Sequence, residues 1–347
     1  MLDRMSDPGG QIPGLIHVSD SEPGLGRRRA GKGFFYLDHR GKRIGDPALI
    51  ARIRALAIPP AWSEVWICPE PAGHIQATGR DSRQRKQYRY HPDWDAWQGE
   101  RKFAGLTAFA RALPRLRDQV DRDLRRRGVP RERVIATIVR LLDKALIRIG
   151  NDRYALENRS FGLTTLTARH LALDGTSLRF SFIGKSGKEW RLSLTDRRIA
   201  NAIRSIQDLP GQRMFRYHDD DGQLQDVRSQ DVNTYIREAM GPDFTSKHFR
   251  TWGASVQAAL SLSQLDTPPS RKAQVRLLNA AIDEVARSLR NTRTVCRQCY
   301  IHPRILDAWE TGVLGDEMTA LRRRLPRPLK GLEAGESQVL RWLSQGE

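Results

Sequence analysis

The sequence predicts an α+β protein with a small β-rich N-terminal domain and a larger, mainly helical domain that contains one β-hairpin. Residues 33–94 carry short runs of β-branched and aromatic residues that are separated by polar turns. From about residue 102, apolar residues recur with the period of an amphipathic helix. Within this helical part, residues 178–194 alternate apolar and polar residues around a Gly/Ser turn, which is typical of a hairpin.

Three segments follow from these patterns. Residues 1–25 are rich in Gly, Pro, Ser and Asp and have little periodicity, so we expect a loose N-terminal segment. Residues 26–100 are predicted to form the β-rich domain and residues 101–347 the mainly helical domain. A chain of 347 residues is long enough for two domains, and no repeat that would indicate a solenoid occurs.

The β-rich part is predicted to start with a hairpin, in which FFYLDHRGKRI turns at His39–Gly41. VWICP, HIQAT and KQYRY then favour strands, and the polar run GRDSRQRK joins the last two. Just upstream, residues 26–32 have the spacing of a phosphate-binding loop. Gly33 stands where that loop needs Ser or Thr to bind Mg²⁺, and no buried strand precedes it, which argues against nucleotide hydrolysis.

The strongest helical signal is RERVIATIVRLLDKALIRIG, residues 131–150, whose apolar residues share one face. Gly128-Val129-Pro130 separates it from a preceding helical pattern over residues 103–127. Further helices are expected at about residues 196–207, 229–239, 245–262, 270–290 and 304–312.

The net charge points to a polyanionic partner. Lys and Arg number 59 against 40 Asp and Glu, which gives a formal charge of +19. Nucleic acid is the first candidate and an anionic membrane surface the second. No apolar run approaches the length of a membrane span, and the N-terminus lacks the apolar stretch of a secretory signal. We therefore expect a cytoplasmic protein.

Cysteine usage agrees with a reducing compartment, because only Cys68, Cys296 and Cys299 occur. Cys296 and Cys299 have the spacing of a zinc-ligand pair, but a zinc site needs two more ligands and His302 could supply only one. Two thiols in a turn of helix are the favoured interpretation.

Basic residues are concentrated in two segments. GRDSRQRKQYRYH, residues 79–91, has five Arg or Lys and one acid. Strand alternation would place Gln87 and Arg89 on one face and Tyr88 and Tyr90 on the other, which suits contact with phosphates and bases, although a polar edge strand would look similar. Residues 111–133 carry nine Arg against four acids, and a solvated helix face and a backbone-binding surface both remain open.

Arg148 lies by helical spacing at the C-terminal edge of the apolar face of residues 131–150. A guanidinium there needs a partner when it loses water. Asp152 or Glu157 could be that partner, and so could a bound phosphate, because the Arg fork matches two phosphate oxygens.

Three further residues stand out by position, although each also has an ordinary structural explanation. Lys185 lies at the tip of the predicted hairpin, where lysines usually serve solubility. Arg250 lies at the border of an apolar stripe on a predicted helix. Tyr300 comes just before Pro303, which stops a helix, and would by itself be a half-buried packing residue.

Taken together, four motifs are more specific. LDKALIRIGNDRYALEN, FSFIGKSGKEW, TSKHFRTWGAS and NTRTVCRQCYIHPRI occur in this order and resemble the catalytic core of type IB DNA topoisomerases, in the compact bacterial and poxvirus form. The stretch IPPAWSEVWICPEPAGHIQATGRDSRQRKQYRYH is similar to the small DNA-clamping domain of that family. The resemblance covers roughly residues 30–310.

The resemblance implies a site. Arg148 matches the family's R-x-G-N arginine, Lys185 the hairpin lysine, Arg250 the F-R-T arginine and Tyr300 the nucleophile. Asn291 falls where many members have a histidine, and it can still donate a neutral hydrogen bond. In the N-terminal domain the segment that matches the DNA-contacting strand supplies the predicted DNA-binding residues: Arg80, Arg83, Arg85, Lys86, Gln87, Tyr88, Arg89 and Tyr90.

The implied reaction is cleavage of one DNA strand through a 3′-phosphotyrosyl link, swivelling and resealing, with no ATP, metal or other cofactor. The implied partner is duplex DNA, preferably supercoiled, held in a C-shaped clamp by a monomer that associates with the nucleoid. A tyrosine recombinase is the nearest alternative, but it typically has H-x-x-R, whereas His248-Phe249-Arg250 gives H-x-R. A non-enzymatic basic nucleic-acid-binding protein would fit the charge and leave the Lys185 and Tyr300 segments unexplained.

Overall fold

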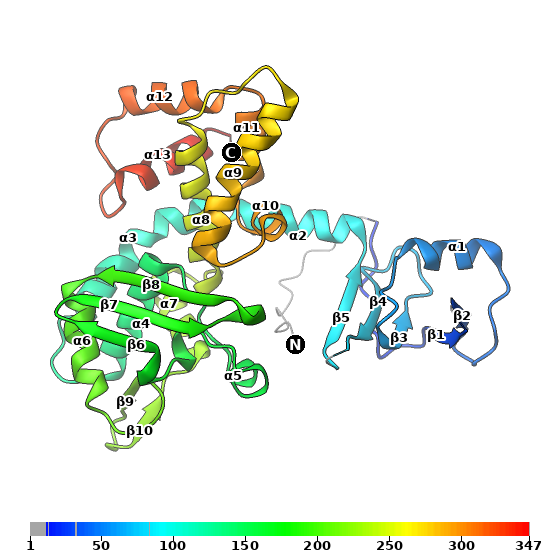
Figure 1. Ribbon diagram of the computed structural model, residues 1–347, viewed down its shortest axis with the longest axis horizontal. Coiled ribbons are helices and arrows are strands. Elements are labelled where there is room, and N and C mark those ends of the chain that lie inside the picture. Colours follow the sequence, from blue (N-terminus) through cyan, green and yellow to red (C-terminus); the bar gives the residue numbers. More distant parts are fainter. Residues whose placement is uncertain (1–11, 13, 32, 83, 347) are drawn as a thin grey trace. The chain divides into compact units, whose positions relative to one another are not determined.

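The computed structural model describes residues 12, 14–31, 33–82 and 84–346. The chain divides into two compact units, Met1–Lys102 and Phe103–Glu347, and the division falls within helix α2 (Pro92–Ala104). The first unit is built on a β-sheet, and the second is mostly helical (Figure 1). This agrees with the predicted α+β class.

The N-terminal unit contains an antiparallel sheet with the strand order β2-β1-β3-β4-β5. The strands are β1 (Leu25–Ala30), β2 (Gly33–Leu37), β3 (Ser63–Ile67), β4 (Ile75–Arg80) and β5 (Lys86–Tyr90). Helix α1 (Pro47–Ala55) packs on a small core made of Leu25, Ile53, Ile67 and Ala77. The three strands predicted before α2 correspond to β3, β4 and β5.

Two elements of this unit differ from the prediction. The partner strand of β2 is β1, which contains the three arginines of the segment that resembled a phosphate-binding loop. The chain does turn back at His39–Gly41 as predicted, since the amide of Asp38 donates to the carbonyl of Lys42 and the amide of Ile44 to that of Tyr36, both at 2.9 Å, but the return arm forms the bridge between Leu37 and Arg43 and no strand of its own. Helix α1 lies where extended structure was expected. It begins at a standard start signal, because Asp46 caps the amide of Ala48 at 2.9 Å and Pro47 occupies the first turn.

The described part of residues 1–25 is attached to this sheet. Ile16 forms a bridge with Gly73, and the amide of Val18 donates to Nδ1 of His74 at 3.1 Å. Asp20 accepts a hydrogen bond from Thr78 of β4 at 2.8 Å. The part of the N-terminal segment that the structure describes therefore extends the sheet domain.

The C-terminal unit contains the remaining elements (Figure 1). Its helices are α3 (Leu106–Asp123), α4 (Arg131–Ala145), α5 (Asp152–Asn158), α6 (Arg197–Gln207), α7 (Ser229–Met240), α8 (Ser246–Leu262), α9 (Arg271–Leu289), α10 (Arg293–Cys299), α11 (Pro303–Glu310), α12 (Leu314–Arg324) and α13 (Ala334–Leu343). Its strands are β6 (Leu171–Asp174), β7 (Ser177–Ile183), β8 (Glu189–Thr195), β9 (Arg216–His218) and β10 (Leu224–Asp226).

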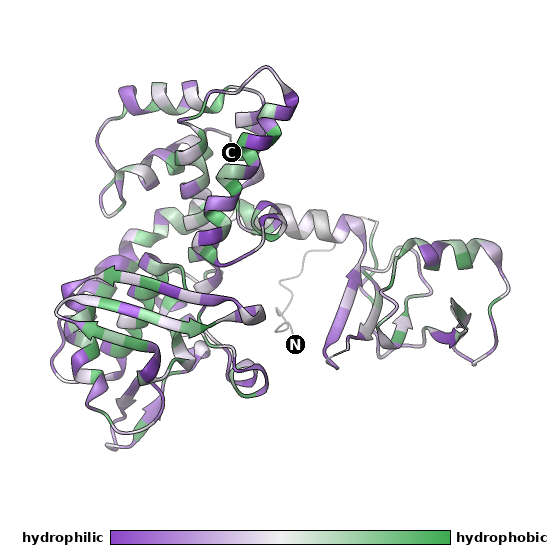
Figure 2. Cartoon of the chain, viewed as in Figure 1, coloured by the Kyte–Doolittle hydropathy of each residue, from purple (hydrophilic) through white to green (hydrophobic). Residues whose placement is uncertain are grey.

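Strands β7 and β8 form the antiparallel pair at the place where a hairpin was predicted, and β6 adds a third strand. Hydrophobic and hydrophilic residues alternate along β7 and β8 (Figure 2), because one face covers the helical core. None of the helices in the described part of the chain is long and apolar enough to cross a membrane.

Helix α4 ends earlier than its apolar pattern suggests. It ends at Ala145 rather than at Gly150, and Leu146 takes the left-handed conformation with φ 52°. The sequence pattern continued because Leu146 and Ile147 remain buried after the helix has ended. Arg148 therefore lies in an irregular segment beyond the helix, and its predicted place on a helical face is wrong.

Candidate active site

The backbone around Arg148 is fixed by a second segment of the chain. The amide of Leu163 donates to the carbonyl of Arg148 at 2.9 Å, and the amide of Thr164 donates to the carbonyl of Ile149 at 2.7 Å. Gly162 permits this approach, because a Cβ atom there would lie 2.5 Å from the nitrogen of Gly150. The position of Arg148 thus depends on tight backbone packing rather than on a helix.

Arg148 is hydrogen-bonded to Asn291. Its Nη2 donates to Oδ1 of Asn291 at 2.7 Å. Asn291 lies two residues after the end of α9, and its amide donates to the carbonyl of Ala286 at 2.9 Å. The two carboxylates considered as partners are bound elsewhere: Asp152 pairs with Arg213 and Glu157 with Arg153. The guanidinium of Arg148 is therefore hydrogen-bonded to a neutral amide, which does not compensate its positive charge.

Arg250 is buried in the first part of α8, with only 4% of its surface exposed. Its two terminal nitrogens donate to the carbonyls of Leu146 and Leu289, the latter at 2.7 Å. Burial lowers the pKa of Arg250 to about 10, and the positive charge of Arg148 adds to this effect. A cation that is buried among neutral carbonyls gains stability when an anion binds beside it.

Tyr300 lies against this arginine. Its ring centroid is 5.2 Å from Cζ of Arg250. Tyr300 follows α10, and Ser255 of α8 holds its backbone: the Ser255 hydroxyl donates to the Tyr300 carbonyl at 3.2 Å and accepts from the His302 amide at 3.0 Å. One helix therefore carries Arg250 and also positions the tyrosine.

Three buried donors in this cluster have no hydrogen-bond partner among the described residues: Nη1 of Arg148, Nε of Arg250 and Nδ2 of Asn291. The orientation of the amide follows from its neighbour, since a guanidinium only donates and the carbonyl oxygen of Asn291 must face it. Buried donors are almost always satisfied in native proteins. The cluster around Arg250 and Tyr300 therefore offers three free donors, and donors of this kind can bind an anion with several oxygens.

Lys185 lies apart from these four residues. It is exposed in the turn Lys185–Gly187 between β7 and β8, and no contact in the described structure joins its side chain to the cluster. The end of β7 beside this turn is nevertheless anchored near Arg148, because the carbonyl of Ile183, two residues before Lys185, accepts from the amide of Phe161, one residue before Gly162. Ser186 and Gly187 both have positive φ, which makes the tip a tight turn.

Cys296 and Cys299 lie in one turn of helix α10, as predicted. Burial raises the pKa of Cys296 to about 11, so the buried thiol is protonated at neutral pH. Nδ1 of His302 accepts from the amide of Arg304 at 3.2 Å and thereby caps α11.

Of the residues predicted to bind DNA, Arg80 ends β4, Arg85 directly precedes β5, and Lys86, Gln87, Tyr88, Arg89 and Tyr90 form β5 at the edge of the sheet. Tyr88 and Tyr90 are on the same face with their rings stacked 5.7 Å apart, as strand alternation predicted. Arg89 donates to the carbonyl of Ala57 at 3.1 Å. Arg83 lies outside the described residues.

Several of these side chains already contact acids. Gln87 donates to the carboxylate of Asp81 at 3.0 Å. The exposed or half-exposed ion pairs are Arg80 with Glu64 at 2.7 Å, Arg85 with Asp81 at 2.7 Å and Lys86 with Asp20 at 2.5 Å. Pairs of this kind contribute only about 0–1 kcal/mol, so a phosphate can replace the carboxylate at little cost.

Comparison with known proteins identifies the family. The profile of the eukaryotic DNA topoisomerase I catalytic core matches residues 92–318, and that of the bacterial DNA topoisomerase IB N-terminal domain matches residues 33–81. The chain is 32% identical to DNA topoisomerase 1B of Acanthamoeba polyphaga mimivirus over 294 residues, which is 83% of this chain and 88% of that protein. The chain belongs to the type IB DNA topoisomerases. The predicted family and enzyme class, a DNA isomerase, are confirmed.

Relatives from cellular organisms share a shorter part of this topoisomerase. DNA topoisomerase 1 of Mycosarcoma maydis is 26% identical over 173 residues, and DNA topoisomerase 1 beta of Arabidopsis thaliana is 27% identical over 168 residues. These matches cover 45% and 48% of this chain and 17% of each relative. The clustered residues of this topoisomerase all lie in the part that matches the catalytic core.

Sequence reasoning missed two residues that position the site of this type IB topoisomerase. Ser255 links α8 to the tyrosine, but a serine in a helix gives no sign of such a contact. Gly162 had a weak signal, since a glycine can mark a close approach of two backbones. Neither role could be assigned without the fold.

Proposed function

We propose that this topoisomerase relaxes supercoiled duplex DNA by transient cleavage of one strand, with Tyr300 as the nucleophile and without ATP or a required metal. The observation that supports the proposal is a linked cluster with free donors. Arg250 lies 5.2 Å from the Tyr300 ring, Arg148 is hydrogen-bonded to Asn291, and each of these three side chains keeps one buried donor without a partner among the described residues. A phosphodiester placed there would satisfy all three donors and would present its phosphorus to the phenol.

The covalent step conserves the phosphate linkage. The oxygen of Tyr300 attacks phosphorus, the bond to the 5′-oxygen breaks, and a 3′-phosphotyrosyl link forms as the phenolic proton is lost. The 5′ end rotates and then attacks the link, which restores the phosphodiester and the phenol. No nucleotide is consumed because the phosphotyrosyl bond retains the energy of the original bond.

The two arginines assist attack and stabilise the transition state. An ordinary tyrosine is ionised about once in a thousand molecules at pH 7, and nearby positive charge favours the phenolate. Negative charge then develops on the non-bridging oxygens, where Arg148, Arg250 and Asn291 can donate. Each preorganised donor of this kind is worth roughly 3 kcal/mol, or about a hundredfold in rate. Fixed cations here do the work that a divalent metal does in other phosphoryl transfers.

Lys185 is the proposed general acid for the 5′-oxygen. The alkoxide is a poor leaving group, and a positioned acid contributes about 10²–10⁴-fold. Because Lys185 lies at a hairpin tip, closing of that tip over bound DNA would complete the site. Lys185→Ala should slow cleavage of normal DNA and should slow it far less when the 5′-oxygen is replaced by sulfur. Equal slowing on both substrates would count against this role.

The N-terminal unit is proposed to hold DNA against the catalytic unit as one arm of a C-shaped clamp. Its β5 edge offers basic side chains with weak ion pairs, and Gln87, Tyr88 and Tyr90 offer groups that can meet bases. Affinity should fall by roughly 10³–10⁵ between 50 and 200 mM salt if six to ten phosphates are neutralised. A much weaker dependence of DNA affinity on salt would argue against binding through this many phosphate contacts.

The decisive experiment is plasmid relaxation in EDTA without nucleotide, combined with rapid denaturation to trap a protein–DNA adduct. The wild-type chain should relax the plasmid and form the adduct, and Tyr300→Phe should do neither. Tyr217→Phe, on β9 of the same unit, is the matched control and should retain both activities. An adduct that persists in Tyr300→Phe would overturn the assignment of the nucleophile.

A monomer is proposed to suffice, because one chain supplies Arg148, Arg250, Asn291 and Tyr300 to the cluster. The relaxation rate should then rise linearly with enzyme concentration. We also propose that the enzyme works on chromosomal DNA in the cytoplasm, which suits the charge of +19.

A further inference from the structure

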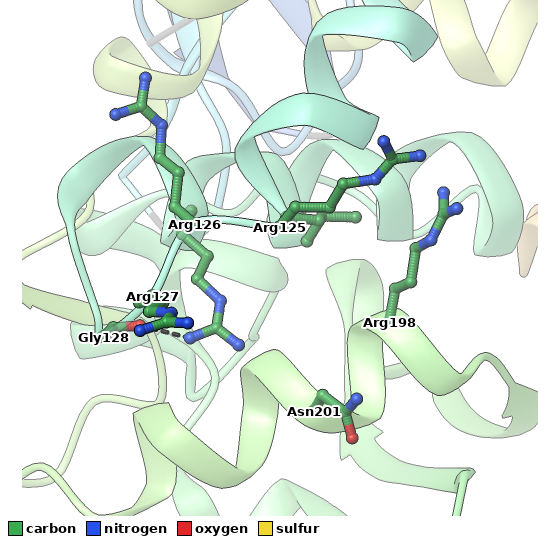
Figure 3. A pocket seen from close by; sticks show the side chains of 8 residues that line it. Arg125, Arg126, Arg127, Gly128, Arg198 and Asn201 are labelled. Atoms are coloured by element: carbon green, nitrogen blue, oxygen red, sulfur yellow. Dashed lines mark hydrogen bonds between the residues drawn. The ribbon is translucent and has the colours of Figure 1, made fainter.

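A second concentration of positive charge lies on the C-terminal unit. The link between α3 and α4 forms one wall of a pocket of about 500 Å³, and α6 forms another (Figure 3). The pocket is lined by Arg125, Arg126, Arg127, Arg133 and Arg198, together with Leu124, Gly128 and Asn201. Part of the arginine-rich segment 111–133, whose role the sequence left open, is therefore folded into a recess.

This pocket is separate from the cleavage site. It lies at the N-terminal end of α4, whereas Arg148 follows the C-terminal end of the same helix. Helix α4 has 15 residues and is therefore about 22 Å long. A ligand in the pocket could not also contact the phosphate bound beside Tyr300 unless it spanned that distance.

Two of the five arginines are compensated by carboxylates. Arg198 pairs with Asp121 at 2.6 Å, and Arg126 pairs with Asp123 at 2.8 Å. In Figure 3 the guanidinium of Arg126 points away from the side to which Arg125 and Arg198 extend. The structure describes residues 103–346 without a gap, and within them Arg125, Arg127 and Arg133 have no ion pair.

Arg133 has no carboxylate partner among the described residues. Its Nη1 donates to the carbonyl of Gly128, and its Nε is buried without a partner among the described residues. Burial lowers its pKa, with no opposing carboxylate. By contrast, Arg117 and Arg140 of the same unit each contact two carboxylates. The fold thus pairs Arg117 and Arg140 with carboxylates and leaves Arg133 uncompensated.

We propose that this pocket binds a compact oligophosphate anion, either inorganic triphosphate or the phosphate chain of a nucleotide. Several planar guanidinium groups that line one recess can bind adjacent phosphate groups, since each fork can bind two oxygens. The volume lies within the range of roughly 300–1,000 Å³ that is usual for small-molecule sites. Duplex DNA is convex and distributes its phosphates along its length, so it fits a recess of this size less well.

The test is isothermal titration of the full chain with sodium triphosphate, ATP and adenosine, without DNA and at constant ionic strength. Triphosphate and ATP should bind saturably and adenosine should not. Equal affinity for the first two would identify the phosphate chain as the ligand, and tighter binding of ATP would identify a nucleotide. Absence of saturable binding of both would overturn the proposal.

Variants locate the binding. Arg133→Gln and the exposed Arg127→Gln should each weaken triphosphate binding at least tenfold, and the second guards against a folding defect in the first. Arg323→Gln, an exposed arginine of α12, removes the same charge and should change affinity less than twofold. An equal effect of all three, or an effect on duplex DNA binding in place of triphosphate binding, would refute the pocket.

The cleavage site can also accept phosphate groups, so Arg148→Gln is measured in parallel. That variant should retain triphosphate binding while it loses DNA cleavage. Arg127→Gln should instead lose triphosphate binding and retain DNA cleavage. Loss of triphosphate binding in Arg148→Gln alone would assign the anion to the cleavage site and would overturn the proposal, while the proposed cleavage reaction would remain untouched.

Discussion

Glu336 of α13 is the carboxylate on which the attachment of the C-terminal helices depends, and Glu336→Gln should destabilise the helical unit. Its oxygens accept hydrogen bonds from Arg117 at 2.6 and 2.8 Å and from the indole of Trp252 at 3.1 Å. Arg117 also contacts Asp143 of α4 at 2.8 Å. The side chain of Glu336 is only 12% exposed, so solvent screens these contacts little.

The expected loss is about 2.5 kcal/mol. A hydrogen bond to a charged group contributes roughly 1.5–3 kcal/mol, and breaking a buried ion pair costs about 3–5 kcal/mol. Glutamine keeps the size and one acceptor, and Asp143 still compensates Arg117, which reduces the loss below that range. For a unit of this size, about 2.5 kcal/mol corresponds to a decrease in Tm of about 5–10 °C.

The effect should depend on pH in a defined direction. Burial raises the pKa of Glu336, but the hydrogen bonds and charge of Arg117 outweigh it and hold the pKa below the usual 4.5. The stabilisation is therefore complete above pH 4.5 and is lost as the pH falls through the folded-state pKa. The difference in stability between wild type and Glu336→Gln should be full at pH 7 and should shrink below pH 4.5.

Differential scanning calorimetry of the full chain at pH 7 and below pH 4.5 measures the difference in stability between wild type and Glu336→Gln. Glu189→Gln is the control, because the carboxylate pairs with Arg191 and is 51% exposed. That change should cost at most about 1 kcal/mol. If Glu336→Gln matched wild type at pH 7, or if the difference did not change with pH, the reasoning from the buried network would be refuted.

Further predictions concern the cleavage site. Gly162→Ala should reduce the rate of adduct formation tenfold or more, because its Cβ would meet backbone next to Arg148, whereas Gly105→Ala meets nothing within 4 Å and should have little effect. Asn291→Ala should slow cleavage about a hundredfold in single-turnover assays, with DNA affinity nearly unchanged; an unaltered rate would exclude Asn291 as a donor. Ser255→Ala should slow cleavage severalfold by loosening the Tyr300 backbone, and an unchanged rate would show that other contacts hold the tyrosine.

Long periodic helices were predictable from the sequence, because their apolar faces contact one core and the pattern repeats over several turns. Helices α6, α7, α8 and α9 lie within a residue or two of their predicted ranges. Strand β1 was not predictable in the same way. Half of its sequence LGRRRA is arginine, Arg28 and Arg29 are exposed, and only Leu25 contributes to the core.

The members of the candidate site were predicted by resemblance, but their contacts were not. Arg148 bonds to a residue 143 positions away, and no local pattern encodes such a partner. The end of α4 was also hidden. Leu146 adopts a left-handed conformation without the glycine that usually marks it, and its side chain continues the apolar pattern.

Arg250 donates to the carbonyls of Leu146 and Leu289, which lie at the C-terminal ends of α4 and α9. The C-terminal ends of helices carry partial negative charge, so one guanidinium stabilises the ends of both helices. The segments that follow these ends carry Arg148 and Asn291. A substitution at position 250 would therefore change the packing of α4 and α9 and the candidate active site at the same time. A lysine has a single ammonium group in place of the guanidinium fork and could not donate to both carbonyls in this geometry.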